Sequence, residues 1–115
     1  MSNNTLSANV RRTDATAIID LRGEINAFGE EALNAAYAEA ARDNAKTILL
    51  NFSSVDYINS TGIALIVGVL AQARKSGRRL TTTGLSDHYL EIFQITRLSD
   101  FMNIYPDEAS ALAAQ

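Results

Sequence analysis

Two hydroxyl side chains stand directly before the most apolar stretch of this sequence. Residues 59–62 read Asn-Ser-Thr-Gly, and an apolar run follows from Ile63 to Ala71. A helix that begins here would expose the Ser60 hydroxyl beside free backbone N–H groups, which favour a phosphate. Phosphorylation would add about −1.5 to −2 charge at pH 7. The segment therefore fits a phosphate acceptor, although Asn59 or Ser60 could equally be a structural N-cap.

Other kinds of chemistry find less support in the sequence. His88, the single histidine, fits a surface or half-buried role better than catalysis. The carboxylates of Glu24, Glu30, Glu31 and Asp56 fit helix-start and loop charges. The chain lacks a G-x-S-x-G elbow, a G-x-x-x-x-G-K-[ST] phosphate loop and any cysteine. We therefore expect no enzyme, no cofactor and no metal site.

The composition indicates one globular domain over residues 1–115. Hydrophobic residues make up 47% of the chain and charged residues 20%, without an internal repeat or linker. A net charge of −3 disfavours nucleic acid as a partner. The local cations Arg74, Lys75, Arg78 and Arg79 fit a solvated helix end. The apolar run is too short to span a membrane and the N-terminus lacks an apolar signal core, so we expect a cytoplasmic protein.

The elements that position residues 59–62 follow from hydrophobic periodicity. Strands are predicted over 5–11, 15–21, 47–52, 78–83 and 101–105, and helices over 27–42, 61–76, 86–97 and from Pro106 and Asp107 to the C-terminus. This order predicts an α/β fold with a mostly parallel sheet of four to five strands, an antiparallel N-terminal edge strand and about four helices. Such sheets place their sites after the strands, which directs attention to the loop after Phe52.

The same pattern predicts which side chains are buried. In the first helix, a buried stripe comprises Phe28, Ala32, Leu33, Ala36, Tyr37 and Ala40. The second helix is apolar almost all round and should be heavily buried, with Gly68 marking close packing against a neighbour. Ile95 should supply an apolar contact of the third helix.

Three segments resemble the STAS domain family. NFSSVDYINSTGIALIVGVLAQARKSGRRL resembles the family signature, in which a strand leads through a D-S-[ST]-G turn into a buried helix. LRGEIN, residues 21–26, resembles its L-x-G-E-[LI]-D segment, and ITRLSDFMNIYPDEASAL resembles its C-terminal third. The resemblance covers roughly residues 5 to 113 and implies an anti-sigma factor antagonist, a regulatory binding module.

The resemblance also implies a site and a partner. Ser60 would be the phosphate acceptor of a serine-protein kinase that doubles as an anti-sigma factor, and phosphorylation would release that partner. The chain departs from the family where Asn59 and Asn26 replace usual aspartates. The implied docking face comprises Glu24, Asn26, Ile58, Asn59, Ser60, Thr61, Gly62, Gly84 and Asp87.

Two other functions fit the sequence. A STAS protein could instead serve as a subunit of a lipid-transport or stress-signalling assembly, which gene neighbourhood would reveal. A small nucleotide-binding α/β domain would show tight ligand binding in calorimetry. The sequence does not determine the oligomeric state.

Overall fold

A computed structural model describes residues 4–114 of the chain as five strands, four α-helices and three short 3-10 helices. In chain order these elements are β1 (Ser7–Thr13), β2 (Thr16–Ile25), η1 (Ala27–Gly29), α1 (Glu30–Ala40), η2 (Arg42–Asn44), β3 (Thr47–Ile58), α2 (Ser60–Lys75), β4 (Arg79–Thr83), α3 (Asp87–Ile95), η3 (Leu98–Asp100), β5 (Asn103–Tyr105) and α4 (Glu108–Ala113).

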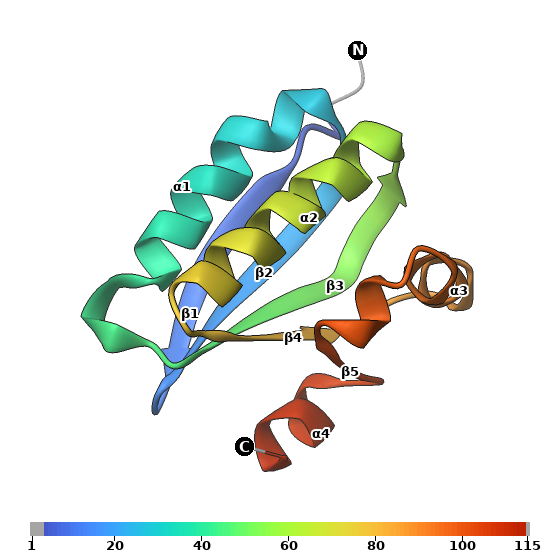
Figure 1. The fold of residues 1–115 in the computed structure, drawn as a ribbon. Coiled ribbons are helices and arrows are strands. Elements are labelled where there is room, and N and C mark those ends of the chain that lie inside the picture. Colours follow the sequence, from blue (N-terminus) through green and yellow to red (C-terminus); the bar gives the residue numbers. More distant parts are fainter. Residues whose placement is uncertain (1–3, 115) are drawn as a thin grey trace.

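The five strands lie in the sheet in the order in which they occur in the chain. β1 pairs antiparallel with β2, and every later neighbour is parallel. The predicted fold class is thus confirmed. Because right-handed crossovers that always advance in one direction leave their helices on one face, α1 and α2 lie side by side over the same face of the sheet (Figure 1).

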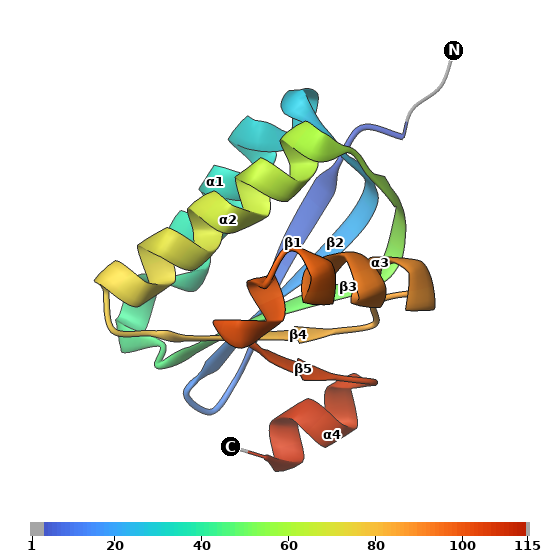
Figure 2. The ribbon, with the colours of Figure 1, turned by 45° about the vertical axis from the view of Figure 1, so that its right-hand side comes forward.

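The two faces of the sheet are covered unequally. One main hydrophobic core joins the sheet to α1, α2 and α3 through residues such as Leu33, Ile66 and Phe93. The opposite face carries a small cluster in which Ala111 of α4 packs on Ile18 and Leu49. Figure 2 shows α4 alone on that side, below β5. The fold is therefore two-layered over most of the sheet.

The prediction of a loop after Phe52 was wrong, because β3 continues to Ile58. Residues 52–58 pair with β2 alone, since the ladder between β3 and β4 ends at Asn51 and Thr83. Most side chains in this half of β3 are solvent-exposed, and several of them are polar. The segment therefore lacks the continuous apolar run by which a buried strand is recognised in a sequence. Nevertheless, it carries the chain beyond β4 to the start of α2.

Three predictions of burial were also wrong. Phe28 is 86% exposed and Ile95 is 70% exposed, so neither belongs to the core. Gly68 is exposed, and a Cβ placed there would have no atom within 4 Å. One face of α2 is therefore open to solvent, with Val67 44% exposed. Periodicity failed here because an almost wholly apolar helix does not reveal which of its faces lacks a neighbour.

Among residues 4–114, the helices are all too short or too polar to cross a membrane.

Candidate functional site

The junction between β3 and α2 is built around the side chain of Asn59. Its backbone is extended, and its amide oxygen accepts a hydrogen bond from the Gly62 N–H at 2.8 Å. The Asn59 carbonyl accepts from the Ile63 N–H at 2.9 Å. Asn59 is therefore the N-cap of α2, and Ser60 is the first residue of the helix. Of the two N-caps that the sequence allowed, the structure uses the amide.

Gly62 allows the first turn of α2 to press against the end of β2. A Cβ built on Gly62 would lie 2.0 Å from the Ile25 carbonyl oxygen, far inside van der Waals contact. The same carbonyl accepts a hydrogen bond from the Asn59 N–H at 3.2 Å. The helix start is thus fixed to the sheet by backbone contacts, which makes the position of Ser60 well defined.

Ser60 faces solvent at this junction. Both Ser60 and the following Thr61 are exposed, and within residues 4–114 neither hydroxyl makes a hydrogen bond. The N–H groups of the first helical turn have no partner inside the helix, and one of them is already satisfied by Asn59. A phosphate on Ser60 would meet the remaining N–H groups and the positive end of the helix dipole.

The end of β2 lies next to Ser60 and carries two more of the predicted residues. Asn26 follows β2 directly and accepts a hydrogen bond from the Phe28 N–H at 3.0 Å, which starts η1. η1 in turn packs against α2. Glu24 is half-buried, and its carboxylate accepts from the Asn4 side chain at 3.4 Å. Glu24 and Asn26 are thus brought to the same end of the molecule as residues 58–62.

Not every residue at this junction can offer its side chain to another molecule. Ile58 is only 5% exposed, and Gly62 is buried. Their place in the site is to position Asn59, Ser60 and Thr61. The exposed or half-buried part of the junction therefore comprises Glu24, Asn26, Asn59, Ser60 and Thr61.

The sequence did not reveal Tyr89, which supports this end of β3. Its hydroxyl is buried and accepts a hydrogen bond from the Ile58 N–H at 2.8 Å. Since β4 no longer accompanies β3 here, the tyrosine supplies a partner that a neighbouring strand would otherwise provide. The only available signal was a tyrosine among the apolar residues of the third helix, a position at which its hydroxyl would need a partner.

Gly84 and Asp87 form a second group at the end of β4. Gly84 has φ +78°, and a Cβ there would lie 2.5 Å from the Ser53 hydroxyl. Ser53 precedes Ile58 by five strand residues, or about 17 Å of strand. Asp87 is exposed at the start of α3, one residue after the N-cap Ser86. Gly84 therefore lies apart from Ser60, and Tyr89 of α3 hydrogen-bonds to Ile58.

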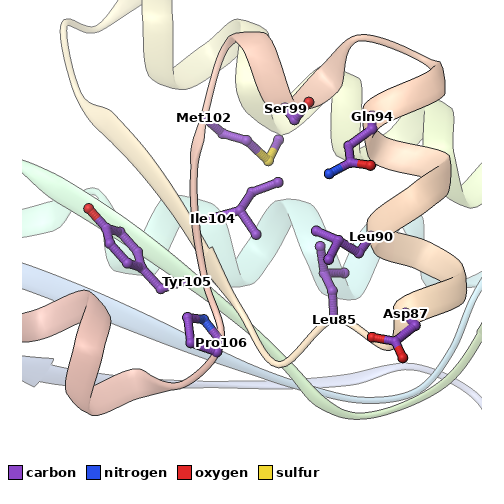
Figure 3. A pocket seen from close by; sticks show the side chains of 9 residues that line it. All are labelled: Leu85, Asp87, Leu90, Gln94, Ser99, Met102, Ile104, Tyr105 and Pro106. Atoms are coloured by element: carbon purple, nitrogen blue, oxygen red, sulfur yellow. The ribbon is translucent and has the colours of Figure 1, made fainter.

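A hollow of about 510 Å³ lies between α3, η3 and β5. In Figure 3, Leu85, Leu90 and Ile104 converge on its interior, whereas Asp87 stands at the rim. Its lining contains one carboxylate and no lysine or arginine, a poor complement to a phosphate. Nothing in this hollow favours the nucleotide-binding alternative. Among residues 4–114, no group of three or more histidine, aspartate or glutamate side chains could hold a metal ion.

Comparison with solved structures defines the class of fold. The chain resembles the crystal structure of an anti-sigma factor antagonist from Mycobacterium paratuberculosis, with a TM-score of 0.83 and 18% sequence identity. The similarity covers 98% of this chain and 96% of that one. The five-stranded sheet of this order with its four α-helices is thus the fold of that solved structure.

Comparison with protein families then shows the family to which the chain belongs. The family described as "Mlab, STAS domain" matches residues 8–105, so the chain belongs to the STAS domain family. The anti-sigma-B factor antagonist of Staphylococcus aureus is 27% identical over 86% of this chain and 94% of its own length. BtrV of Bordetella bronchiseptica, a candidate anti-sigma factor antagonist, is 30% identical over 90% of this chain and 86% of its own. These relatives are regulatory binding proteins, and the chain is accordingly not an enzyme.

Proposed function

We propose that this protein is an anti-sigma factor antagonist whose binding to a partner protein is controlled by phosphorylation of Ser60. Unphosphorylated, it binds a serine-protein kinase that also acts as an anti-sigma factor, and so frees the sigma factor. Phosphorylated, it releases that partner. The names of the two relatives support the general role, and the exposed hydroxyl at the start of α2 supports the switch.

The proposal depends mainly on one observation: Asn59 caps α2, whereas Ser60 is exposed and does not cap it. Asn59 caps α2, so the Ser60 hydroxyl has no structural task to perform. A phosphate there adds about two negative charges beside free N–H groups, at little cost to the fold. The same group is bulky and strongly hydrated, so it prevents a partner from closing over the junction. A modification can therefore change binding without unfolding the domain.

Replacement of the usual aspartates by Asn26 and Asn59 is compatible with this switch. Asparagine caps a helix about as well as aspartate, so α2 keeps its start. The amide removes a negative charge next to the phosphorylated serine. We expect the phosphate to be accommodated here with less repulsion than beside a carboxylate.

Phosphosite mass spectrometry after incubation with ATP and the serine-protein kinase encoded nearest to this chain's gene tests the acceptor. We expect one phosphate on Ser60 in the wild type and in Thr61→Ala, and none in Ser60→Ala. Thr61→Ala is the matched control because Thr61 is the adjacent exposed hydroxyl. Phosphate on Thr61 in the wild type would contradict the assignment.

A binding assay with the same kinase tests the switch. We expect Ser60→Asp to bind at least about tenfold more weakly than the wild type, whereas Ser60→Ala should bind as the wild type does. Equal binding by Ser60→Asp and the wild type would count decisively against control at this serine.

A further inference from the structure

An aromatic side chain projects into solvent next to the candidate switch, and the proposed function has not used it. Phe28 is 86% exposed, more than any other large hydrophobic residue within residues 4–114. It lies in the middle of η1, which packs against α2. Figure 1 shows this turn at the same end of the molecule as the start of α2.

The fold holds this turn in place without using the phenylalanine ring. The Phe28 N–H donates to the Asn26 side chain at 3.0 Å, and the Gly29 N–H donates to the Asn26 carbonyl at 2.9 Å. Gly29 is buried, and a Cβ on it would lie 3.0 Å from two carbon atoms of Leu6. The backbone N–H groups of Phe28 and Gly29 are thus both hydrogen-bonded to Asn26, and the ring is presented on a turn that is already ordered.

A large apolar side chain on an ordered turn is suited to anchor a protein interface. Such anchors are few, are often aromatic, and insert into pockets of the partner. They bind more tightly when little conformational freedom is lost on association. Phe28 meets these conditions, and its contact with a water-excluding pocket would offset the cost of its present exposure.

The surroundings of Phe28 indicate the chemistry of the partner's surface. Glu30 and Glu31 in the first turn of α1 are exposed, and they line an open hollow together with Phe28. No lysine or arginine lines that hollow. A complementary surface would therefore be an apolar pocket with lysine or arginine at its rim.

We infer that Phe28 is the apolar anchor by which this protein binds the kinase of its proposed function, inserting into an apolar pocket with a cationic rim. The inference rests on the proposed function, because it assigns a further contact to the same partner. η1 packs against α2 at the end where α2 begins, so a partner that holds Phe28 would lie close to Ser60 (Figure 1). A phosphate on Ser60 would then act by obstructing the fit around an anchor that is itself unchanged.

Tryptophan fluorescence tests the anchor directly, because the chain contains no tryptophan. Phe28→Trp places the only indole at the proposed contact. We expect its emission to shift to shorter wavelength when the unphosphorylated protein is titrated with the kinase, as the ring leaves water. Phe101→Trp is the matched control, since Phe101 is also exposed (52%) but contacts Arg74 near the other end of α2. Its emission should not change.

Affinity measurements complete the test. We expect Phe28→Ala to bind the kinase at least about tenfold more weakly than the wild type, while Phe101→Ala binds normally. Phe28→Ala should unfold at the wild-type denaturant concentration, because the ring makes little contact with the fold. Glu30→Gln with Glu31→Gln should weaken binding at low salt and reduce its dependence on ionic strength.

The possible failures are distinguishable. If Ser60→Asp weakens binding but Phe28→Ala does not, the anchor is wrong and the proposed function stands. If Phe28→Ala weakens binding but Ser60→Asp does not, the anchor stands and the switch is wrong. Failure of the wild type to bind the kinase overturns both. A shift of the Phe28→Trp emission with protein concentration alone would show that a second copy is the occupant, which overturns the inference.

Discussion

At the scale of single residues, the side chain that holds the start of α2 is a different one from the proposed phosphate acceptor. Asn59 satisfies the Gly62 N–H, and Ser60 remains exposed beside it. If the serine itself were the cap, a phosphate on it would disturb the hydrogen bond that starts the helix. In this protein the proposed phosphorylation of Ser60 would leave the hydrogen bond of the cap unchanged.

Replacing each of the two glycines of α2 by alanine should change the free energy of unfolding in opposite directions. Gly62→Ala should lower the free energy of unfolding by about 3 kcal/mol, because the new Cβ would overlap the Ile25 carbonyl. Gly68→Ala should raise it by about 1 kcal/mol, because the site is exposed and alanine favours the helix. Chemical denaturation of both variants measures these changes. A Gly62→Ala protein as stable as the wild type would show that α2 can move away from β2, so that Ser60 is not held in place.

At the scale of elements, the second half of β3, residues 52–58, depends on contacts with α3. Residues 52–58 of β3 have a strand partner on one side only, and the Tyr89 hydroxyl binds the Ile58 N–H on the other. α3 therefore supports the strand that delivers Asn59 and Ser60. A second contact between the two elements is the edge-to-face packing of Phe93 of α3 on Phe52 of β3, with ring centroids 5.9 Å apart.

Removal of that hydroxyl should loosen the end of β3. Tyr89→Phe keeps the ring but leaves the Ile58 N–H unpaired, which should cost about 1–3 kcal/mol. Hydrogen exchange measured residue by residue should show the Ile58 amide exchanging faster, while amides of Ile48 and Leu49, deep in the sheet, change only with global stability. Unchanged protection at Ile58 would mean that another group satisfies this amide.

At the scale of the whole molecule, a polar network links the C-terminal helix to the opposite edge of the sheet. Arg11 of β1 donates to Asp20 of β2 at 2.9 Å and to Glu108 of α4 at 2.7 Å. Asp20 also accepts from the Asn51 side chain at 2.8 Å, and Asn51 accepts from the Ser53 hydroxyl at 2.7 Å. This network spans the sheet face that lacks α1 and α2, and together with the Ala111 contacts it holds α4 there.

Because of this network, the free energy of unfolding should depend on pH in the acidic range. The hydrogen bond from Arg11, followed by that from Asn51, holds the pKa of the Asp20 carboxyl below its ordinary value of 3.8. Because the folded pKa lies below the unfolded one, Asp20 stabilises the fold above pH 3.8, and that stabilisation is lost as the pH falls through the folded pKa. Denaturation followed over this range should therefore show a shallower dependence on pH in Asp20→Asn than in the wild type.

Asp56→Asn is the matched control for this pH dependence. Asp56 is an exposed aspartate of β3 outside the network, so Asp56→Asn removes one carboxylate and leaves the hydrogen bonds of Asp20 in place. If Asp20→Asn and Asp56→Asn gave the same pH profile, the network would make no contribution beyond that of an ordinary surface aspartate.

Local patterns of residues were sufficient to predict the order of the elements, the parallel sheet with its antiparallel edge, and the serine at the start of the second helix. These features depend on local patterns. A buried strand appears in the sequence as a continuous apolar run, and the start of a helix appears as a capping residue before an apolar stripe. For this reason the sequence pointed to Asn59 or Ser60 and to Ser86 or Asp87 as caps, and the structure uses Asn59 and Ser86. The resemblance to the STAS family rested on the same segments.

Which surfaces have neighbours could not be predicted from local patterns and became clear from the folded chain. Whether β3 continues past Phe52, whether Gly68 is packed and whether Phe28 is buried depend on elements distant in the sequence, and local periodicity carries no information about them. The pairing of Tyr89 with Ile58 joins residues 31 positions apart. For the same reason, the exposed phenylalanine beside Ser60 emerged only from the folded chain, since an aromatic residue in a helical pattern looks like core until the space around it is known.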